Sequence, residues 1–168
     1  ASAMIAARIA GMLSDASPDQ NIAMSRRPDG RFMDLAPKLA AARLNAVFLK
    51  EMRTDRYFTM ALGFLNTGTG RLRMVQAGHP NPLVLRADGQ VEEIGSGGMP
   101  VGLLPEPIFC ACDTRLAPGD RVLLFSDGLT ECPGPGDTML EEEGLIDLVG
   151  GLSEKRGEAF LDAMRDKL

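Results

Sequence analysis

The sequence predicts an α+β fold in which antiparallel β-sheet is flanked by helices. Apolar residues recur at helical spacing near both ends of the chain, in residues 1–13, 34–52, 141–149 and 158–168. Between residues 57 and 125 the spacing changes to two, and turn residues recur at strand-length intervals. A doubly wound parallel fold needs strands and helices to alternate, so this order of elements favours antiparallel sheet covered by helices.

The length and composition indicate one soluble globular domain spanning residues 1–168. Hydrophobic residues make up 45% of the chain, which is long enough to bury a core without disulfides or structural metals. The formal net charge is −5, and the densest basic spot is the pair Arg26 and Arg27, which argues against a nucleic-acid-binding surface. The sequence contains no membrane-length apolar run and no signal peptide, so a cytoplasmic protein without membrane attachment is expected.

The cysteines predict a reduced protein without a disulfide framework. Cys110, Cys112 and Cys132 make an odd count and have no paired spacing. Cys110 and Cys112 are expected to be small core residues. The alternative, a metal-thiolate pair, would need further ligands, and the single histidine of the chain cannot complete a tetrahedral zinc site with them.

Two helices and a loop are expected in the first third of the chain. Residues 1–13 predict an amphipathic helix with no capping residue before it, which suggests that the chain is cut from a longer protein. Residues 14–32 are polar and are expected to form a loop, with a partner-docking flap as the alternative. Asp34 is expected to cap a helix that runs to about Met52. Asn45 interrupts the apolar face of that helix and is expected to bond a neighbouring backbone group.

Three successive hairpins are expected in the middle of the chain. The paired strands are residues 57–65 with 71–77, 83–86 with 91–94, and 108–116 with 121–125. Such hairpins imply antiparallel pairing. Residues 95–107 are rich in Gly and Pro and are expected to form a loop that crosses between sheets or lines a cleft.

Asp127 is the residue on which the functional prediction depends. Residues 121–125 form a short apolar run that predicts a buried strand, and Asp127 follows at its end with Gly128 behind it. Glycine lets the backbone turn sharply and leaves room for metal and water, so a carboxylate here can approach a hard cation. The alternative is that Asp127 only opens a turn, since Asp-Gly is among the commonest turn pairs.

The whole run 116–131 reads Leu-x-Pro-Gly-Asp-x-Val-Leu-Leu-Phe-Ser-Asp-Gly-Leu-Thr-Glu. It resembles the manganese- or magnesium-dependent phosphatases of the PPM (protein phosphatase 2C) superfamily, in particular their bacterial sporulation stage II protein E branch, which includes regulators of stress sigma factors. Residues 77–83 look like the Ala-Gly-His-x-Pro-Pro-Leu loop of that branch, and residues 98–103 look like its Gly-x-Pro-Leu-Gly-Leu segment. Residues 57–60 are similar to a fourth segment.

The resemblance implies a four-layer α-β-β-α sandwich and a site for two Mn²⁺ or Mg²⁺ ions. In the family, metal ligands also come from an upstream Gly-Asp-x-x-Gly-His-Gly loop and a downstream Asp-Asp pair, and this chain has neither. Only Asp127 carries over as a metal ligand, with Gly128 allowing close approach of the backbone. The chain is therefore expected to lack terminal strands at both ends and to follow a sensor or receiver domain in its parent protein.

His79, the only histidine, lies in the loop that matches the family. It is a candidate general acid for the leaving serine oxygen, and the alternative is that it bonds backbone groups and shapes the cleft. Other acids, namely Glu131, Asp137 and residues 141–143, are not assigned to metal. The run 141–143 is interpreted as a solvated helix start favoured by the helix dipole.

The functional hypothesis is a cytoplasmic, metal-dependent protein serine/threonine phosphatase in bacterial signalling. By resemblance, its substrate is a phosphorylated regulatory protein such as an anti-sigma-factor antagonist. The alternative is a catalytically silent phosphatase-like module that binds or sequesters a regulatory partner. A third hypothesis is that the first helix, or a coiled coil upstream of it, forms a homodimer.

Overall fold

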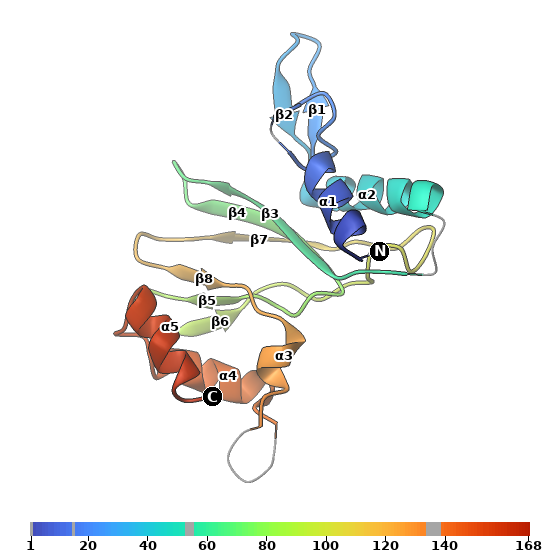
Figure 1. Ribbon diagram of the computed structural model, residues 1–168. Coiled ribbons are helices and arrows are strands. Elements are labelled where there is room, and N and C mark those ends of the chain that lie inside the picture. Colours follow the sequence, from blue (N-terminus) through green and yellow to red (C-terminus); the bar gives the residue numbers. More distant parts are fainter. Residues whose placement is uncertain (1, 15, 53–55, 134–138) are drawn as a thin grey trace.

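The computed structural model describes residues 2–14, 16–52, 56–133 and 139–168 and confirms the predicted α+β class (Figure 1). The helices are α1 (Ser2–Met12), α2 (Pro37–Met52), α3 (Asp127–Thr130), α4 (Glu141–Gly150) and α5 (Glu158–Arg165). The strands are β1 (Met24–Arg26), β2 (Phe32–Asp34), β3 (Met60–Asn66), β4 (Arg71–Ala77), β5 (Leu83–Leu85), β6 (Val91–Glu93), β7 (Ala111–Arg115) and β8 (Arg121–Leu123). No helix in this part of the chain is both long and apolar enough to cross a membrane.

The described residues form two three-stranded antiparallel sheets, in the orders β3-β4-β7 and β6-β5-β8, that pack face to face. Successive side chains of a strand point to opposite faces. In β4, Leu72 and Met74 therefore pack between the sheets with Val84 of β5. In β5, the flanking Leu83 and Leu85 point the other way and pack against α4 and α5. With α2 on the outer face of the first sheet, this alternation produces the expected layers α-β-β-α (Figure 1).

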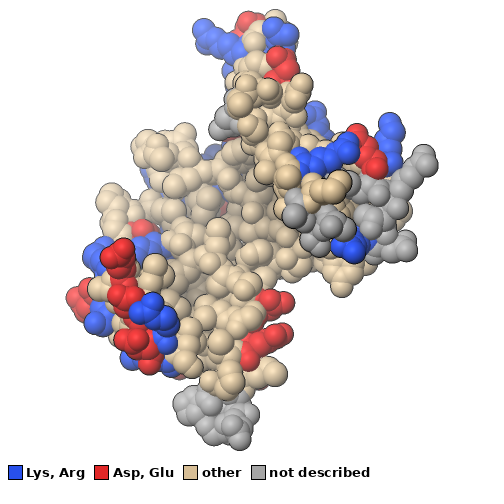
Figure 2. Space-filling model, viewed as in Figure 1, with Lys and Arg blue, Asp and Glu red and all other residues tan. Residues whose placement is uncertain are grey.

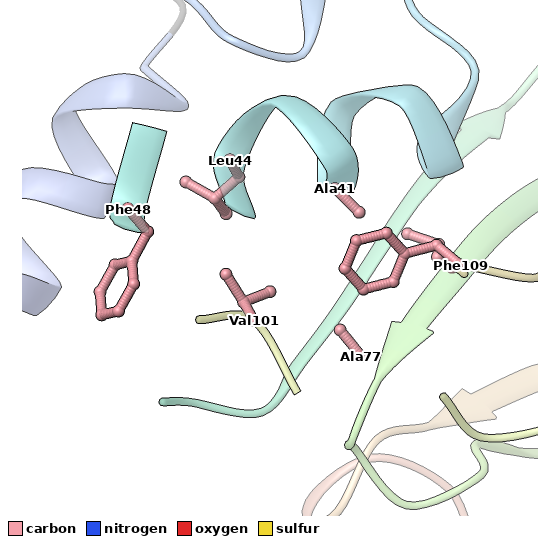
Figure 3. Close-up of a cluster of buried hydrophobic side chains, with 7 residues drawn as sticks. Ala41, Leu44, Phe48, Ala77, Val101 and Phe109 are labelled. Carbon is pink, nitrogen blue, oxygen red and sulfur yellow. The ribbon is translucent and has the colours of Figure 1, made fainter. Parts of the chain in front are cut away.

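Helix α2 covers the half of the first sheet nearest the end of β4. Phe48 is 2% exposed, and its ring lies 5.1 Å from that of Phe58 in an edge-to-face arrangement. Asn45 on the same helix is buried and donates to the Leu104 carbonyl at 2.9 Å while accepting from the Gly102 amide at 2.8 Å, which confirms its structural role. The buried apolar side chains on both sides of this interface are Ala41, Leu44, Phe48, Val75, Ala77, Val101 and Phe109 (Figure 3).

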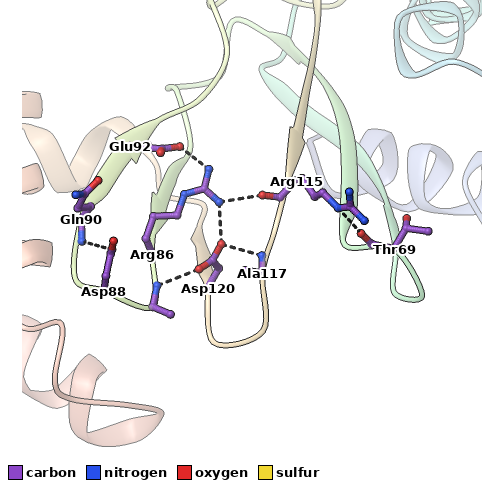
Figure 4. A network of polar contacts seen from close by, with 9 residues as sticks. Thr69, Arg86, Asp88, Gln90, Glu92, Arg115, Ala117 and Asp120 are labelled. Atoms are coloured by element: carbon purple, nitrogen blue, oxygen red, sulfur yellow. Dashed lines mark hydrogen bonds and ion pairs between the residues drawn. The ribbon is translucent and has the colours of Figure 1, made fainter.

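The third predicted hairpin is wrong. Strand β7 pairs with β4 in one sheet, whereas β8 pairs with β5 in the other, so the turn at residues 116–120 carries the chain between sheets. The turn itself forms as expected, with the Asp120 amide donating to the Ala117 carbonyl at 3.1 Å. The Asp120 carboxylate, 3% exposed, accepts from the backbone amides of Ala117 and Ala87, both at 2.9 Å, and pairs with Arg86 (Figure 4). These bonds attach the turn to the β5–β6 sheet.

The polar segment 14–32, expected to be a loop, contributes to a short hairpin. Strands β1 and β2 pair antiparallel, with Met24 opposite Asp34, and the tight turn uses Gly30 at a φ of 85°. Asp34 is therefore a strand residue and not a helix cap, and α2 begins at Pro37. Strands of three residues are too short to show a period in the sequence, which is why the pairing was missed.

Two burial predictions also need correction. Strand β8 lies at the edge of its sheet, so Val122 and Leu124 remain 37% and 60% exposed, whereas Leu123 packs toward the helices. The expected fully buried strand before Asp127 is thus only half-buried. Cys110, expected in the core, is exposed, and Cys112 is partly buried against the cluster between the sheets.

Candidate functional site

A cavity of about 390 Å³ collects the residues that the sequence singled out. It lies where the loops that follow β4 and β6 meet the start of α3. His79 and Asp127, far apart in the sequence, both line it. The complete lining is Thr59, Gly78, His79, Pro80, Gly97, Gly98, Ser126, Asp127, Thr130 and Glu142.

Asp127 is the first residue of the short helix α3 and is exposed to solvent. Its Oδ1 accepts a hydrogen bond from the Gly128 amide at 2.9 Å, and its backbone carbonyl accepts from Thr130 Oγ1 and the Glu131 amide, both at 2.9 Å. These bonds fix the backbone beneath the side chain. No described residue bonds Oδ2, so that oxygen is free to bind a ligand.

Gly128 does not line the cavity, and its carbonyl accepts from Cys132 Sγ at 3.2 Å. A Cβ placed on Gly128 would meet only Ser126 Oγ, at 3.7 Å, which is ordinary van der Waals contact. Its contribution to this site is the hydrogen bond that its backbone amide donates to Asp127 Oδ1. Its role in admitting a metal stays a prediction.

His79 follows β4 in a loop that turns at Gly78, which has a φ of 71°. The Gly78 amide donates to the Gly98 carbonyl at 2.9 Å, which joins this loop to the one after β6. His79 Nδ1 lies 2.9 Å from the Pro80 carbonyl, and because a carbonyl can only accept, Nδ1 is assigned the proton. The imidazole is thereby oriented by its own loop, and in the neutral ring Nε2 remains an acceptor.

Glu142 is a third ionisable side chain in the cavity, and the sequence-based interpretation missed it. The sequence predicts only a solvated helix start at this position, because nothing local distinguishes Glu142 from Glu141 and Glu143. Two tertiary features place Glu142 in the cavity. Helix α3 packs on α4, and the Leu140 amide, directly before α4, donates to the Cys132 carbonyl at 2.9 Å.

Glu131 instead lines a neighbouring cavity of about 430 Å³, shared with Glu141, Glu142 and Glu143. Acidic side chains accordingly gather around α3 and the start of α4 on the face shown in Figure 2. Asp137 lies outside the described residues. The acidic surroundings favour a cationic ligand.

The donor set fits part of a site for a hard cation. Asp127 and Glu142 offer carboxylate oxygens, the ligands that Mn²⁺ and Mg²⁺ prefer, and such ions keep several waters. Within the described ranges, however, no group of three or more His, Cys, Asp or Glu side chains is placed to hold a metal. The described residues alone therefore supply two carboxylates to such a site.

A larger groove of about 1180 Å³ lies at the opposite end of β4. It is lined by Arg73 and Arg115 among others, and by Arg71 and Asp113, which form an ion pair with each other. None of the residues predicted from the sequence to carry chemistry lines this groove. The smaller cavity around Asp127 is the candidate site.

Comparison with known proteins identifies a family whose model matches the whole chain and relatives that match part of it. The family model described as Stage II sporulation protein E (SpoIIE) matches residues 1–168. Protein IcfG of Synechocystis is 24% identical over 132 residues, which cover 77% of this chain and 21% of IcfG. Phosphoserine phosphatase RsbU of Bacillus subtilis is 27% identical over 97 residues, which cover 57% of this chain and 29% of RsbU. The matched regions span less than a third of either relative.

Solved structures show the same fold. The RsbU and RsbW domains of Rv1364c from Mycobacterium tuberculosis match 78% of this chain and 36% of theirs, with 25% identity and a TM-score of 0.58. The Mn-presoaked phosphatase domain of SpoIIE from Bacillus subtilis matches 96% of this chain and 62% of its own, with 16% identity and a TM-score of 0.58. The SiaA-PP2C domain of Pseudomonas aeruginosa matches 80% of this chain and 54% of its own, with 16% identity and a TM-score of 0.60. The resemblance seen in the sequence motifs is confirmed, and the chain belongs to the stage II sporulation protein E (SpoIIE) family.

Proposed function

We propose that this chain is the phosphatase domain of a metal-dependent protein serine/threonine phosphatase. The observation that carries the proposal is the convergence of His79 and Asp127 on one cavity, in a chain of the SpoIIE family. The relative named phosphoserine phosphatase RsbU and the phosphatase and PP2C domains among the structural neighbours support the same reaction class.

Asp127, through its free Oδ2, is the residue that would hold the cation, with Glu142 as a second carboxylate in the same cavity. Two bound Mn²⁺ or Mg²⁺ ions would supply an activated water and neutralise phosphoryl oxygens. In its doubly protonated form, His79, oriented by its Nδ1–H bond to the Pro80 carbonyl, can present Nε2–H to the leaving serine oxygen and deliver that proton, which leaves the ring neutral. Gly78, Gly97 and Gly98 line the cavity without side chains and leave space for a phosphoseryl group.

The proposed substrate is a phosphorylated regulatory protein, such as an anti-sigma-factor antagonist. RsbU and RsbW domains occur together in the Mycobacterium tuberculosis relative, which supports a role in bacterial signalling. We further propose that other segments of a parent protein complete the ligand set, that a sensor or receiver domain there controls the site, and that the protein works in the cytoplasm. Pairing through α1 would make it a homodimer.

A second candidate function follows from the metal-ligand count. Because the described residues place only two carboxylates in the cavity, a catalytically silent phosphatase-like module that binds or sequesters a regulatory partner protein is the alternative. Such a module would use the same cavity without turnover. The two functions differ in their response to metal.

The deciding experiment is phosphate release from a phosphoserine peptide by the intact parent protein, with and without Mn²⁺. Turnover that requires Mn²⁺ and disappears in Asp127→Asn establishes the phosphatase. The matched control is Asp147→Asn, an exposed carboxylate on the outer part of α4, which should leave turnover unchanged. A well-folded parent without turnover would instead support the binding module.

A further inference from the structure

The loops after β4 and after β6, which both line the candidate cavity, are joined by a pair of side-chain amides, Gln76 and Asn81, in addition to the Gly78–Gly98 backbone bond. We propose that these two residues are positioning residues that set the separation of the two loops and thereby the place of His79, which lies on the first of them. The inference rests on the proposed function, because the separation of the loops matters only if the cavity is the active site. It assigns a role to residues that contribute no side chain to the cavity lining.

Gln76 stands in β4 directly before the His79 loop and is 2% exposed. Its side chain uses both ends of the amide. Nε2 donates to Asn81 Oδ1 at 2.6 Å and to the His79 carbonyl at 3.2 Å, and Oε1 accepts from the Ser96 amide at 3.1 Å. A single buried side chain therefore bonds the loop after β4 and the loop after β6.

Asn81 completes the connection from the other side. Its Oδ1 accepts from the Gly97 amide at 3.0 Å as well as from Gln76, and its Nδ2 donates to Glu93 at the end of β6. Gly97 itself lines the cavity. The pair thus forms a bridge, called here the amide bridge, that runs from Gln76 through Asn81 to the Gly97 backbone.

The backbone around the bridge is built for close approach. Gly95 has a φ of 107°, and a Cβ there would lie 1.6 Å from Gln76 Oε1. Gly98, at a φ of 155°, would place a Cβ 2.5 Å from the Gln76 carbonyl oxygen. Both positions require glycine, because the backbone has a positive φ and because a side chain would collide with Gln76. The loop after β6 therefore packs closely against Gln76.

Filling the core would not require an amide side chain at position 76. An apolar residue at position 76 could fill the space between the sheets, as Leu72 and Met74 do on the same face of β4. Buried amides are retained when each of their bonds is made, and these bonds are directional. A loop displaced by about 1 Å can cost about a hundredfold in rate, which gives such a bridge a function in a catalytic site.

The test uses Asn81, a half-buried loop residue whose replacement does not empty the core. Asn81→Ala removes the bridge. Asn81→Asp, always combined with Glu93→Gln so that the new carboxylate faces an amide and not a second carboxylate, is the matched variant, because a carboxylate still accepts from Gln76 and from the Gly97 amide. In the loop motif quoted above the corresponding residue is proline, so Asn81→Pro provides a second bridge-free variant without an amide side chain. Circular dichroism confirms that each variant is folded.

The first readout is NMR of this chain. His79 is its only histidine, so the imidazole Cε1–H gives one signal that needs no further assignment. We expect Asn81→Ala and Asn81→Pro to move this signal and to speed hydrogen exchange of the Gly97 amide at least about tenfold, with Asn81→Asp close to the unsubstituted chain. An unmoved signal and unchanged exchange in both bridge-free variants would overturn the bridge.

The second readout is Mn²⁺-dependent kcat toward the phosphoserine peptide, measured in the parent protein carrying the same substitutions. We expect about a tenfold loss in fully folded Asn81→Ala and rescue to within about twofold in Asn81→Asp. If the parent protein is active and its Asn81→Ala variant keeps the same kcat, the positioning role is refuted and the proposed function is not. A parent with no turnover would refute the proposed function together with the positioning role, while the NMR arm would still decide whether the bridge exists.

Discussion

Arg86 Nη1 lies 2.7 Å from Asp120 Oδ2, and this ion pair secures the turn by which the chain leaves one sheet and enters the other. The same Nη1 donates to the Arg115 carbonyl at 2.9 Å, at the last residue of β7, and Nη2 pairs with Glu92 in β6 (Figure 4). One guanidinium therefore contacts both sheets of the sandwich. The contacts explain why a sequence with the local pattern of a hairpin forms a crossover.

Asp120→Asn should destabilise the fold at neutral pH by about 1–3 kcal/mol, because a buried, hydrogen-bonded charge beside Arg86 is lost. Burial favours a higher pKa for Asp120, but hydrogen bonds from the Ala117 amide, Arg86 and the Ala87 amide outweigh it and lower the pKa. A lowered folded-state pKa contributes stability above the unfolded pKa of about 3.9 that is lost as pH falls through the folded value. Urea unfolding between pH 7 and pH 2 should therefore show a smaller acid loss in the variant than in the unsubstituted chain. Equal pH slopes would contradict the assignment.

Phe48→Ala should lower the free energy of unfolding by about 3–5 kcal/mol, because it empties a buried site between α2 and the first sheet. Leu39→Ala provides the control, since Leu39 lies on the same helix and is 50% exposed. Its effect should stay within about 0.5–1 kcal/mol. Similar losses for the two variants, measured by chemical denaturation, would mean that α2 does not pack as described.

His79→Ala should lower Mn²⁺-dependent turnover by about a hundredfold or less, which is the low end of what a general acid supplies. Asp127→Asn should remove turnover altogether, because that substitution takes away the charge of the proposed cation ligand. Single-turnover kinetics with a phosphoserine peptide measure both. A His79 variant as inactive as the Asp127 variant would reverse this ranking of the two residues.

Glu142→Gln should weaken Mn²⁺ binding about tenfold, whether the carboxylate binds the ion directly or through water. Calorimetric titration of the parent protein with Mn²⁺ reports this without requiring activity. Glu143→Gln is the matched control, since Glu143 is the next residue of α4 but does not line the Asp127 cavity. Equal Mn²⁺ affinity in the Glu142 and Glu143 variants would remove Glu142 from the site.

Iodoacetamide should modify Cys110 before Cys112 at pH 7.5. Cys110 is exposed, whereas burial raises the pKa of the Cys112 thiol, so that less of the reactive thiolate is present. Mass spectrometry of the labelled peptides gives the order. Faster labelling of Cys112 would show that the region between the sheets opens more readily than its packing indicates.

Sequence periodicity was sufficient for the elements with many turns or long strands. Helices α1, α2, α4 and α5 and the β3–β4 and β5–β6 hairpins lie where their apolar spacing and turn residues predict them. The motif resemblance added the four-layer arrangement, which periodicity could not select over a simpler two-layer one. The β1–β2 hairpin was missed because its three-residue strands depend on pairing with each other and not on a local pattern.

The sequence by itself determined the family, the α+β class and the two candidate residues His79 and Asp127, because these depend on local motifs and spacing. Only the tertiary structure decided that the turn at Asp120 joins two sheets, that Glu142 enters the cavity and that Gln76 and Asn81 bond the loop after β6. Each of these results depends on contacts between residues distant in the chain. Such contacts follow from how the layers pack, and a local run of residues carries no record of which distant groups will satisfy its hydrogen bonds.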